Sequence, residues 1–126
     1  TGVLAQRLVR NVCTACRVAY RPSDTELEKL GINRERWKAY GGDLVFKAVG
    51  CNECSKRGYR GRTGIYELLL VDDDIRQLIL KNVDSSTIKK KAIEKGMLIL
   101  LDDGARKIAA GETTIAEVLS VTQEDI

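Results

Sequence analysis

Four cysteines in two identical pairs constrain this chain more than any other feature of its sequence. Both pairs follow the pattern C-x-x-C, so each places two thiols on one tight turn. Two such pairs brought together supply four thiolates, which match the tetrahedral preference of zinc. The chain has no histidine, so any zinc site must use cysteine alone. The sequence therefore predicts a structural zinc site with no open position. Its four predicted ligands are Cys13, Cys16, Cys51 and Cys54.

Three other chemistries use cysteine pairs of this kind. Two disulfides would require an oxidising compartment and usually a small, cysteine-dense secreted domain, whereas this chain has four cysteines in 126 residues and no signal-peptide pattern at its start. A thioredoxin-like redox motif would explain one pair and leave the second unexplained. Iron held by four thiolates has the same ligand set, and spacing does not separate it from zinc. Zinc is favoured, and iron stays open as the alternative metal.

The composition is that of a globular protein. Hydrophobic residues make up 44% of the chain and charged residues 31%, and the length suits one ordinary domain or two small ones. No apolar run approaches the roughly 18–20 residues that a membrane-spanning helix needs, so no direct membrane span is expected. The chain opens Thr1-Gly2 without a methionine, as a piece of a longer protein would.

Positive charge is concentrated in the part that carries the cysteines. Residues 7–62 hold 13 Lys and Arg against 6 Asp and Glu, whereas residues 63–126 hold 8 against 12. Four thiolates around a divalent ion carry about two net negative charges, which nearby cations would offset. We expect that role for the basic residues close to the cysteines, and a nucleic-acid patch is the less favoured use. These residues are Arg10, Arg17, Lys56, Arg57, Arg60 and Arg62.

The insert between the two cysteine pairs carries its own folding signals. It is 34 residues long, more than a minimal zinc ribbon requires. Ser23 and Glu26 form a capping-box pattern that predicts a short helix. Asn33 is expected to cap a second short helix around Trp37. Residues 44–49 are expected to form a strand that leads to the second pair.

A hairpin is expected to carry this insert at its tip. Residues 58–64 contain three glycines, which indicates a sharp turn or a close backbone approach. Residues 65–71 follow as a largely apolar strand. The segment 1–12 has apolar residues at helical spacing but is equally consistent with an extended chain. We prefer pairing of residues 6–12 with residues 64–71, because it closes the zinc module between two adjacent strands.

Four short helices are predicted after this strand. Their expected starts are Asp72 or Asp73, Asp84 or Ser85, about residue 98, and the capping-box pattern of Thr114 and Glu117. The predicted fold class is therefore α+β: a short antiparallel β-hairpin bearing a tetracysteine zinc-stapled insert, followed by a small α-helical bundle. Residues 1–62 would form the strand and zinc part, and residues 63–126 the strand and helical part.

Several motifs, in this order, resemble the C-terminal part of the secretion ATPases, the motors of type II secretion and type IV pilus assembly. The retraction motors of that superfamily lack the cysteine insert, so the similarity is to the secretion or assembly branch. It covers essentially the whole chain. The motifs are residues 4–10, the two C-x-x-C pairs, and residues 58–68, 95–97, 102–104 and 111–119.

This resemblance implies a hexameric, cytoplasmic motor, peripheral to the inner membrane, that hydrolyses ATP to add pilins or pseudopilins. ATP and magnesium would be bound by upstream parts of the parent protein. This sequence contains no Gly-Lys dipeptide and hence no G-x-x-x-x-G-K-[ST] phosphate loop, so we expect no catalytic residue and no ATP hydrolysis in the 126-residue chain. Expected partners are the rest of the ATPase, neighbouring subunits, and inner-membrane platform or assembly proteins, with no nucleic acid. The zinc insert is expected to dock on protein.

Two other function classes compete with this one. A zinc-ribbon nucleic-acid-binding module would use the basic, glycine-rich residues 56–62, with Tyr59 as a stacking residue. An aromatic content of 5% is thin for such a surface. An independent enzyme lacks any imidazole for serine-, cysteine- or metal-hydrolase chemistry.

The remaining charged and aromatic features have structural interpretations. The run Asp72–Asp74 suits a helix N-terminus, where negative charge complements the macrodipole. Asp102 and Asp103 are expected on the bundle surface. Residues 89–91 are three lysines that spread around a helix and form a solvated face. Trp37 and Phe46 are expected in the core of the insert.

Overall fold

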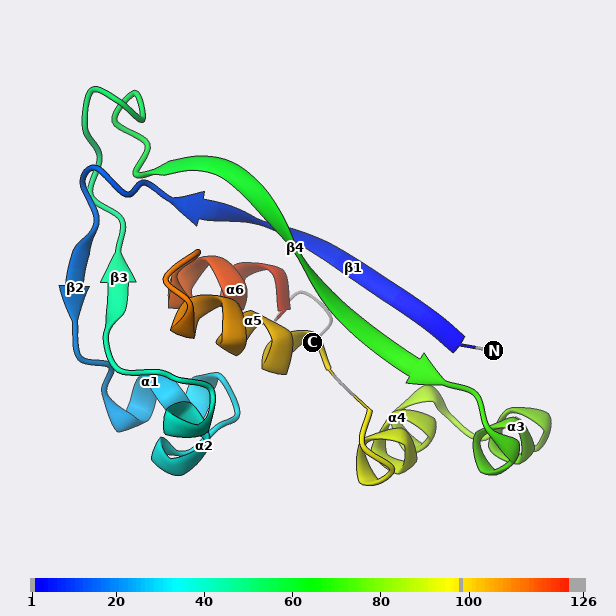
Figure 1. The fold of residues 1–126 in the computed structure, drawn as a ribbon. Coiled ribbons are helices and arrows are strands. Elements are labelled where there is room, and N and C mark those ends of the chain that lie inside the picture. The colour runs from blue at the N-terminus through cyan, green and yellow to red at the C-terminus, as the bar shows by residue number, and fades with distance from the viewer. Residues whose placement is uncertain (1, 98, 123–126) are drawn as a thin grey trace.

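The computed structural model of the chain describes residues 2–97 and 99–122. Its longest feature is an antiparallel hairpin of β1 (Gly2–Val12) and β4 (Tyr59–Leu70), which crosses the whole molecule (Figure 1). The ambiguous first segment is therefore a strand. The preferred pairing is confirmed, and it extends from Gly2 opposite Leu70 to Val12 opposite Tyr59.

The glycine-rich stretch differs from its predicted turn, because most of it belongs to β4. Gly64 lies opposite Leu8, and a Cβ there would come within 2.8 Å of the Tyr66 hydroxyl, so a larger residue would displace the end of that side chain. Gly61 has φ +75°, which side chains avoid, and it lies where the register between the strands shifts. The glycines thus allow β4 to remain one continuous strand across the shift in register.

The insert between the hairpin strands is a small unit of two strands and two helices. The strands β2 (Val18–Tyr20) and β3 (Val45–Lys47) pair antiparallel, so the predicted strand is shorter than expected. They lead down to α1 (Asp24–Lys29) and α2 (Arg34–Ala39), at the lower left of Figure 1 and away from the hairpin. Both predicted caps are confirmed: the capping box of α1 is complete, and Asn33 accepts a hydrogen bond from a backbone N–H of α2.

Four helices follow the hairpin and form two separate pairs (Figure 1). The first pair is α3 (Asp73–Leu80) and α4 (Ser85–Glu94). Their N-caps are Asp72 and Asp84, and each is one of the two residues predicted for that cap. The second is α5 (Leu100–Ala109) and α6 (Ile115–Thr122), under the middle of the hairpin. Residue 98, near which the third helix was expected to begin, lies outside the described residues. The α+β fold class is confirmed.

The core lies where the insert, the hairpin and the α5–α6 pair meet, and α5 packs against β3 there. It takes side chains from β1, β4, α1, α2, β3, α5 and α6, and none among its described members from α3 or α4. The predicted division after residue 62 falls within β4 and stays a prediction. The core residues are Val9, Leu27, Leu30, Ile32, Trp37, Val45, Ile65, Ala105, Ile108, Ile115 and Val118.

No helix among the described residues has the length and apolar character needed to cross a membrane.

Candidate metal centre

Both cysteine pairs lie in tight turns at one end of the hairpin, in the loops above β2 and β3 in Figure 1. The N–H of Arg17 donates to the carbonyl of Cys13 (3.1 Å), and that of Lys56 donates to the carbonyl of Cys51 (2.7 Å), which closes each turn. A third bond, from the N–H of Cys13 to the carbonyl of Gly58 (2.9 Å), ties the first turn to the second. Backbone hydrogen bonds thus hold the turns side by side.

Two glycines make this packing possible. Gly58 has φ +84°, and a Cβ there would lie 2.8 Å from the Cβ of Ala48. Gly50 has φ +114°, and its Cβ would lie 2.8 Å from the carbonyl oxygen of Lys56. Any other residue would be strained in its backbone and would also displace a neighbour. The second turn therefore depends on glycine before and after the cysteine pair.

The four predicted ligands come together in space. All four Sγ atoms lie within 4.8 Å of one another, and no other such group was found among the described residues. The spacing is too wide for disulfides, whose sulfurs lie about 2.05 Å apart. It fits a tetrahedron instead, because zinc–sulfur bonds of about 2.3 Å place neighbouring sulfurs about 3.8 Å apart. The measured separations are 3.8 Å for Cys13 and Cys51, 3.9 Å for Cys16 and Cys54, and 3.7 Å for Cys51 and Cys54.

Backbone N–H groups point at two of the sulfurs. The Cys54 sulfur accepts from the N–H groups of Cys51 and Gly58, each at 3.2 Å, and the Cys16 sulfur accepts from that of Gly50 at 3.3 Å. Burial opposes ionisation of Cys54, yet these donors lower its pKa to about 6. Although the N–H of Gly50 favours its thiolate, the pKa of Cys16 rises to about 11 because of burial and the neighbouring thiols. A bound cation would let all four sulfurs ionise.

Some of the basic residues expected to offset the negative charge of the four thiolates have other partners. The guanidinium of Arg17 lies 3.9 Å over the ring of Phe46 and donates to the carbonyl of Gly111 at 3.0 Å. Phe46, expected in the core of the insert, is only half-buried there. Arg60 lies 4.0 Å from Glu53. Three others are exposed to solvent: Lys56, Arg57 and Arg62.

A buried polar network joins the base of the metal centre to α6, and the sequence did not reveal it. Glu117, 8% exposed, accepts from the backbone N–H of Arg10 at 3.0 Å and from its guanidinium at 3.0 and 2.9 Å. Burial opposes its ionisation, but Arg10 holds the pKa of Glu117 below its usual value. The Thr113 hydroxyl donates to the carbonyl of Arg10 at 2.7 Å, and the Tyr59 hydroxyl bonds that of Thr114 at 2.9 Å.

This network also corrects the capping box predicted at α6. The hydroxyl of Thr114 caps the helix, accepting from the N–H of Glu117 at 3.1 Å. The carboxylate of Glu117, however, turns to Arg10, which offers it both a backbone N–H and the stronger, charge-assisted bonds of a guanidinium. Its long-range partner is 107 residues away, which no local pattern can reveal.

The expectation that Asp102 and Asp103 lie on a bundle surface is wrong for Asp102, whereas Asp103 is partly exposed. Asp102 is 9% exposed and accepts from the hydroxyl of Tyr40 at 3.2 Å and the guanidinium of Arg36 at 3.3 Å. Asp103 accepts from the backbone N–H of Tyr66 at 2.9 Å. The pair therefore fastens α5 to the insert on one side and to β4 on the other.

The other structural interpretations are confirmed. Asp72 caps α3 by accepting from the N–H of Ile75 at 3.0 Å. Residues 89–91 are exposed, and Lys89 pairs with Glu67 at 3.3 Å. Trp37 is fully buried in the core.

Comparison with known proteins gives one consistent result. Residues 1–120 match the family described as type II/IV secretion system protein. The chain is 44% identical over 124 residues to the type II secretion system protein E of Pseudomonas aeruginosa, and 43% identical over 123 residues to the type IV pilus assembly ATPase PilB of Thermus thermophilus. It is 41% identical over 123 residues to the type II secretion system ATPase E of Vibrio cholerae.

The matches cover 98% of this chain but only a small part of each relative. That part is 24% of the Pseudomonas protein, 23% of the Vibrio protein and 14% of the Thermus protein. The family match spans nearly all of the chain, and it includes both cysteine pairs, the hairpin and the residues that fasten α5 and α6 to it. The chain therefore belongs to the type II/IV secretion system protein family.

Proposed function

We propose that this chain is the C-terminal, non-catalytic, zinc-binding part of an ATPase that powers type II protein secretion or type IV pilus assembly. The names of its relatives support the class of machine, and they favour neither secretion nor pilus assembly. The chain has no Gly-Lys dipeptide, so the phosphate loop of such a motor would lie in another part of the protein. The parent would be a cytoplasmic hexamer, peripheral to the inner membrane, that binds ATP and magnesium.

The observation that carries the zinc proposal is the spacing of the four sulfurs. Cys13, Cys16, Cys51 and Cys54 lie within 4.8 Å of one another, as a tetrahedral tetrathiolate site requires. With four protein ligands, zinc would have no position for water or substrate, so its role would be structural. It would replace the hydrophobic core that the two turns lack. Iron would fit the same ligand set and is the alternative metal.

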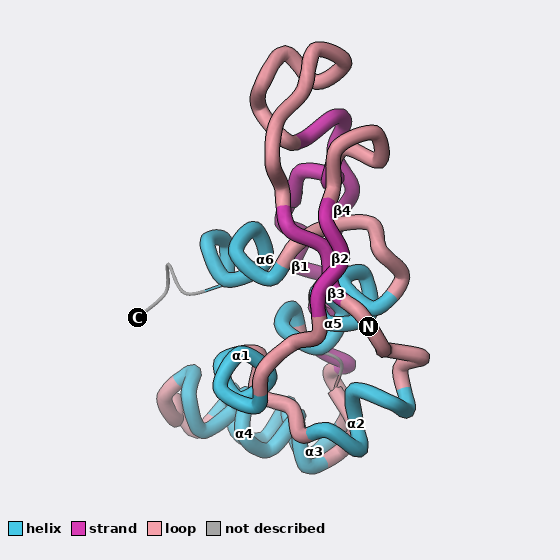
Figure 2. The backbone as a smooth tube through the Cα atoms, turned by 90° about the vertical axis from the view of Figure 1, so that its left-hand side faces the viewer, coloured by secondary structure: helices cyan, strands magenta, loops and turns pink. Residues whose placement is uncertain are grey.

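The stapled turns would serve as a docking knob at the end of the hairpin. They project beyond β2 and β3, away from the core, where another protein can reach them (Figure 2). The partners we propose are neighbouring subunits, the rest of the ATPase, and the inner-membrane platform or assembly proteins.

Metal analysis and ATP hydrolysis test this proposal together. The purified chain should contain one zinc per molecule by elemental analysis, and Cys51→Ser with Cys54→Ser should abolish binding. The longer protein should hydrolyse ATP, whereas the 126-residue chain should release no phosphate above the blank. Stoichiometric iron would replace zinc as the metal, and hydrolysis by the short chain would disprove its non-catalytic role.

The nucleic-acid alternative depends on Tyr59, and the contacts of that ring do not favour it. Tyr59, its expected stacking residue, is covered by the guanidinium of Arg10 at 4.2 Å from the ring centre. Its hydroxyl is bonded to Thr114 at 2.9 Å. A base could not stack on this ring without displacing the arginine. Salt-dependent binding of oligonucleotides at low ionic strength would revive this alternative.

A further inference from the structure

A hollow next to the second cysteine turn is lined by three arginines. They are Arg10 of β1, Arg62 of β4, and Arg57, which follows the last cysteine by three residues. Tyr59 and Gly61 complete the lining, and the volume is about 400 Å³. We call this site the arginine hollow. It gathers positive charge from both strands of the hairpin and from the turn that joins β4 to the metal centre.

Two of these arginines lie directly opposite each other in the hairpin. The register pairs Arg10 with Arg62, and like charges in such a pair repel each other. Beside this pair, Arg60 and Gly61 of β4 lie opposite Asn11 alone, which is a β-bulge with glycine at φ +75°. Bulges of this kind re-aim the side chains next to them. A negative group placed between the two arginines would turn their repulsion into attraction.

The chain itself neutralises only one of the three charges. Glu117 accepts from Nε and Nη2 of Arg10, at 3.0 and 2.9 Å. Arg57 and Arg62 are exposed, and neither forms an ion pair with any residue that the structure describes. Offsetting the four thiolates requires positive charge near them, but it does not require three guanidiniums around one hollow. Two positive charges are therefore left for a ligand.

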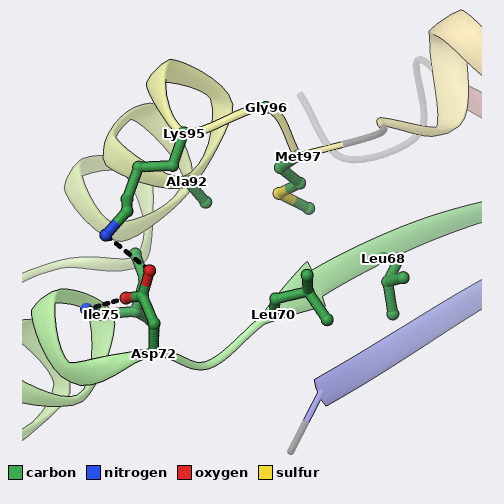
Figure 3. Close-up of a pocket in the computed structure, with 8 residues that line it drawn as sticks. All are labelled: Leu68, Leu70, Asp72, Ile75, Ala92, Lys95, Gly96 and Met97. Atoms are coloured by element: carbon green, nitrogen blue, oxygen red, sulfur yellow. Dashed lines mark hydrogen bonds and ion pairs between the residues drawn. The ribbon is translucent and has the colours of Figure 1, made fainter.

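A cleft at the other end of β4 shows the opposite arrangement. There Lys95 forms ion pairs with Asp72 and Asp74, and Figure 3 shows its ammonium group directed at Asp72. Nearby, Lys89 pairs with Glu67 at 3.3 Å. The charges of that region are balanced by its own carboxylates, whereas those of the arginine hollow are not.

Arg10 is ordered before any ligand arrives. Its guanidinium lies 4.2 Å from the centre of the Tyr59 ring, and Tyr59 is itself fixed by the bond of its hydroxyl to Thr114 at 2.9 Å. Glu117 holds two of its three side-chain nitrogens, and no described residue bonds the third, Nη1. A ligand that binds an ordered side chain immobilises less on binding, so the site is preorganised.

We infer that the arginine hollow binds an acidic segment of a partner protein, with one carboxylate between Arg10 and Arg62 and another on Arg57. Guanidinium groups bind carboxylates through paired N–H···O bonds, as Arg10 binds Glu117. One exposed ion pair contributes little, so a lone small anion is held weakly. A segment with several carboxylates binds more tightly, because its first contact raises the effective concentration of the next.

The shape and contacts of the site favour a protein segment over other polyanions. A hollow admits a narrow segment, whereas a planar bilayer would reach only its rim. Nucleic acid would need the Tyr59 ring for stacking, and Arg10 covers it. This inference rests on the proposed function only in taking the metal end of the chain as a docking surface, and it adds the chemistry of the partner.

Binding of a fluorescent hexaglutamate peptide to the 126-residue chain tests the inference. Measured by anisotropy at low ionic strength, Arg57→Gln with Arg62→Gln should weaken binding about tenfold. The matched control, Arg21→Gln with Arg76→Gln, removes two exposed arginines outside the hollow and should weaken binding less than about threefold. The two double variants have equal net charge, so their difference reports on the hollow and not on long-range attraction.

Chemical protection gives a second measurement on the unmodified sequence, which no folding defect of a variant can affect. The peptide should protect Arg57 and Arg62 from modification by phenylglyoxal, read by mass spectrometry. Arg21 should stay fully reactive, because it lies outside the hollow.

Four outcomes would overturn the inference. Equal weakening in the two double variants, or equal protection of Arg21, would show that the hollow is not the site. Inorganic phosphate that binds as tightly as the peptide would make it a phosphate site. Protection by phosphatidylglycerol vesicles and not by the peptide would assign it to a membrane. Metal analysis and ATP hydrolysis test the proposed function separately, so its failure is distinguishable from a failure of peptide binding.

Discussion

The two ends of this molecule are built from the same hairpin and differ in how they are held. At the metal end, β1 and β4 meet the insert, α5 and α6, and their inward residues Val9 and Ile65 are fully buried. At the far end, the same strands expose Leu4 and Leu70, and α3 and α4 contribute no described residue to the core cluster. One end is closed by its own side chains, and the other is open.

The comparison shows two ways in which a short chain completes a fold. The metal end brings together segments up to 107 residues apart, through the core, the Arg10–Glu117 pair and four converging thiols. At the far end, α3 and α4 bury only Ile75 and Ala92, and polar contacts such as those of Glu67 with Lys89 and with the N–H of Leu100 add to these. We expect the metal end to unfold as a unit and the far end to move independently of it.

Loss of the metal should have the largest effect. Binding of zinc to such sites contributes about 10–16 kcal/mol of apparent free energy at neutral pH, which exceeds the stability of most small domains. Cys51→Ser with Cys54→Ser should therefore unfold the insert. Trp37 is the only tryptophan and is 1% exposed, so its emission should shift to longer wavelength.

Circular dichroism shows whether the double cysteine variant loses only the helices of the metal end or all of its helices. We expect the part of the helical signal that comes from α3 and α4 to persist, because these helices share no described core residue with the insert. Loss of all helical signal would show that the metal supports both ends. The two ends would then not differ in how they are held.

A matched pair of substitutions on β4 should give the next largest difference. Ile65→Ala removes a fully buried side chain and should cost about 2–5 kcal/mol of unfolding free energy in the 126-residue chain. Leu70→Ala, five residues along the same strand and 66% exposed, should cost less than about 0.5 kcal/mol. Chemical denaturation of both variants measures this directly. Equal costs would mean that the far end is already closed.

Local signals in the sequence predicted much of the metal end. The cysteine spacing identified the four sulfurs that converge, and the caps at Ser23 and Asn33 located α1 and α2. These patterns succeed because each depends on atoms only a few residues apart. The hairpin also followed from pattern, since a single apolar strand must find a partner nearby.

What the sequence did not reveal depends on distant partners. Asp102 looked like a surface residue because nothing local shows that Tyr40 and Arg36, more than 60 residues earlier, will bond it. Glu117 matches a capping-box pattern in the sequence, but in the structure its carboxylate accepts hydrogen bonds from Arg10. Periodicity found the helices correctly and could not assign them to two separate pairs, because each helix has an apolar side whichever neighbour it meets.

The Arg10–Glu117 pair should show an intermediate effect with a distinct pH dependence. Glu117→Gln should cost about 1–2 kcal/mol at pH 7, since Arg10 is half exposed and solvent weakens the pair. The pKa of Glu117 is lowered on folding, so its contribution is present above the unfolded pKa of about 4.3 and is lost as pH falls through the lower folded value.

Wild type and Glu117→Gln should therefore converge in stability below about pH 4, as measured by thermal unfolding across pH. The control Glu28→Gln changes an exposed carboxylate of α1 and should leave stability within about 0.5 kcal/mol at every pH. A gap between wild type and Glu117→Gln that stays constant down to pH 3 would show that the carboxylate charge is not what Arg10 recognises.

The smallest effects come from two helix caps, and they test the comparison most finely. Ser23 and Asp84 each accept one backbone N–H, at 3.1 and 2.8 Å, and replacing either by alanine should cost its helix about 1 kcal/mol. For Ser23→Ala this cost should appear as a lower global melting temperature, because α1 buries Leu27 in the core. For Asp84→Ala it should appear as faster hydrogen exchange confined to α4, with little change in global melting, because α4 can open without disturbing that core. If both variants lower the melting temperature equally, the two ends are one cooperative unit, and their different burial has no consequence for how the molecule unfolds.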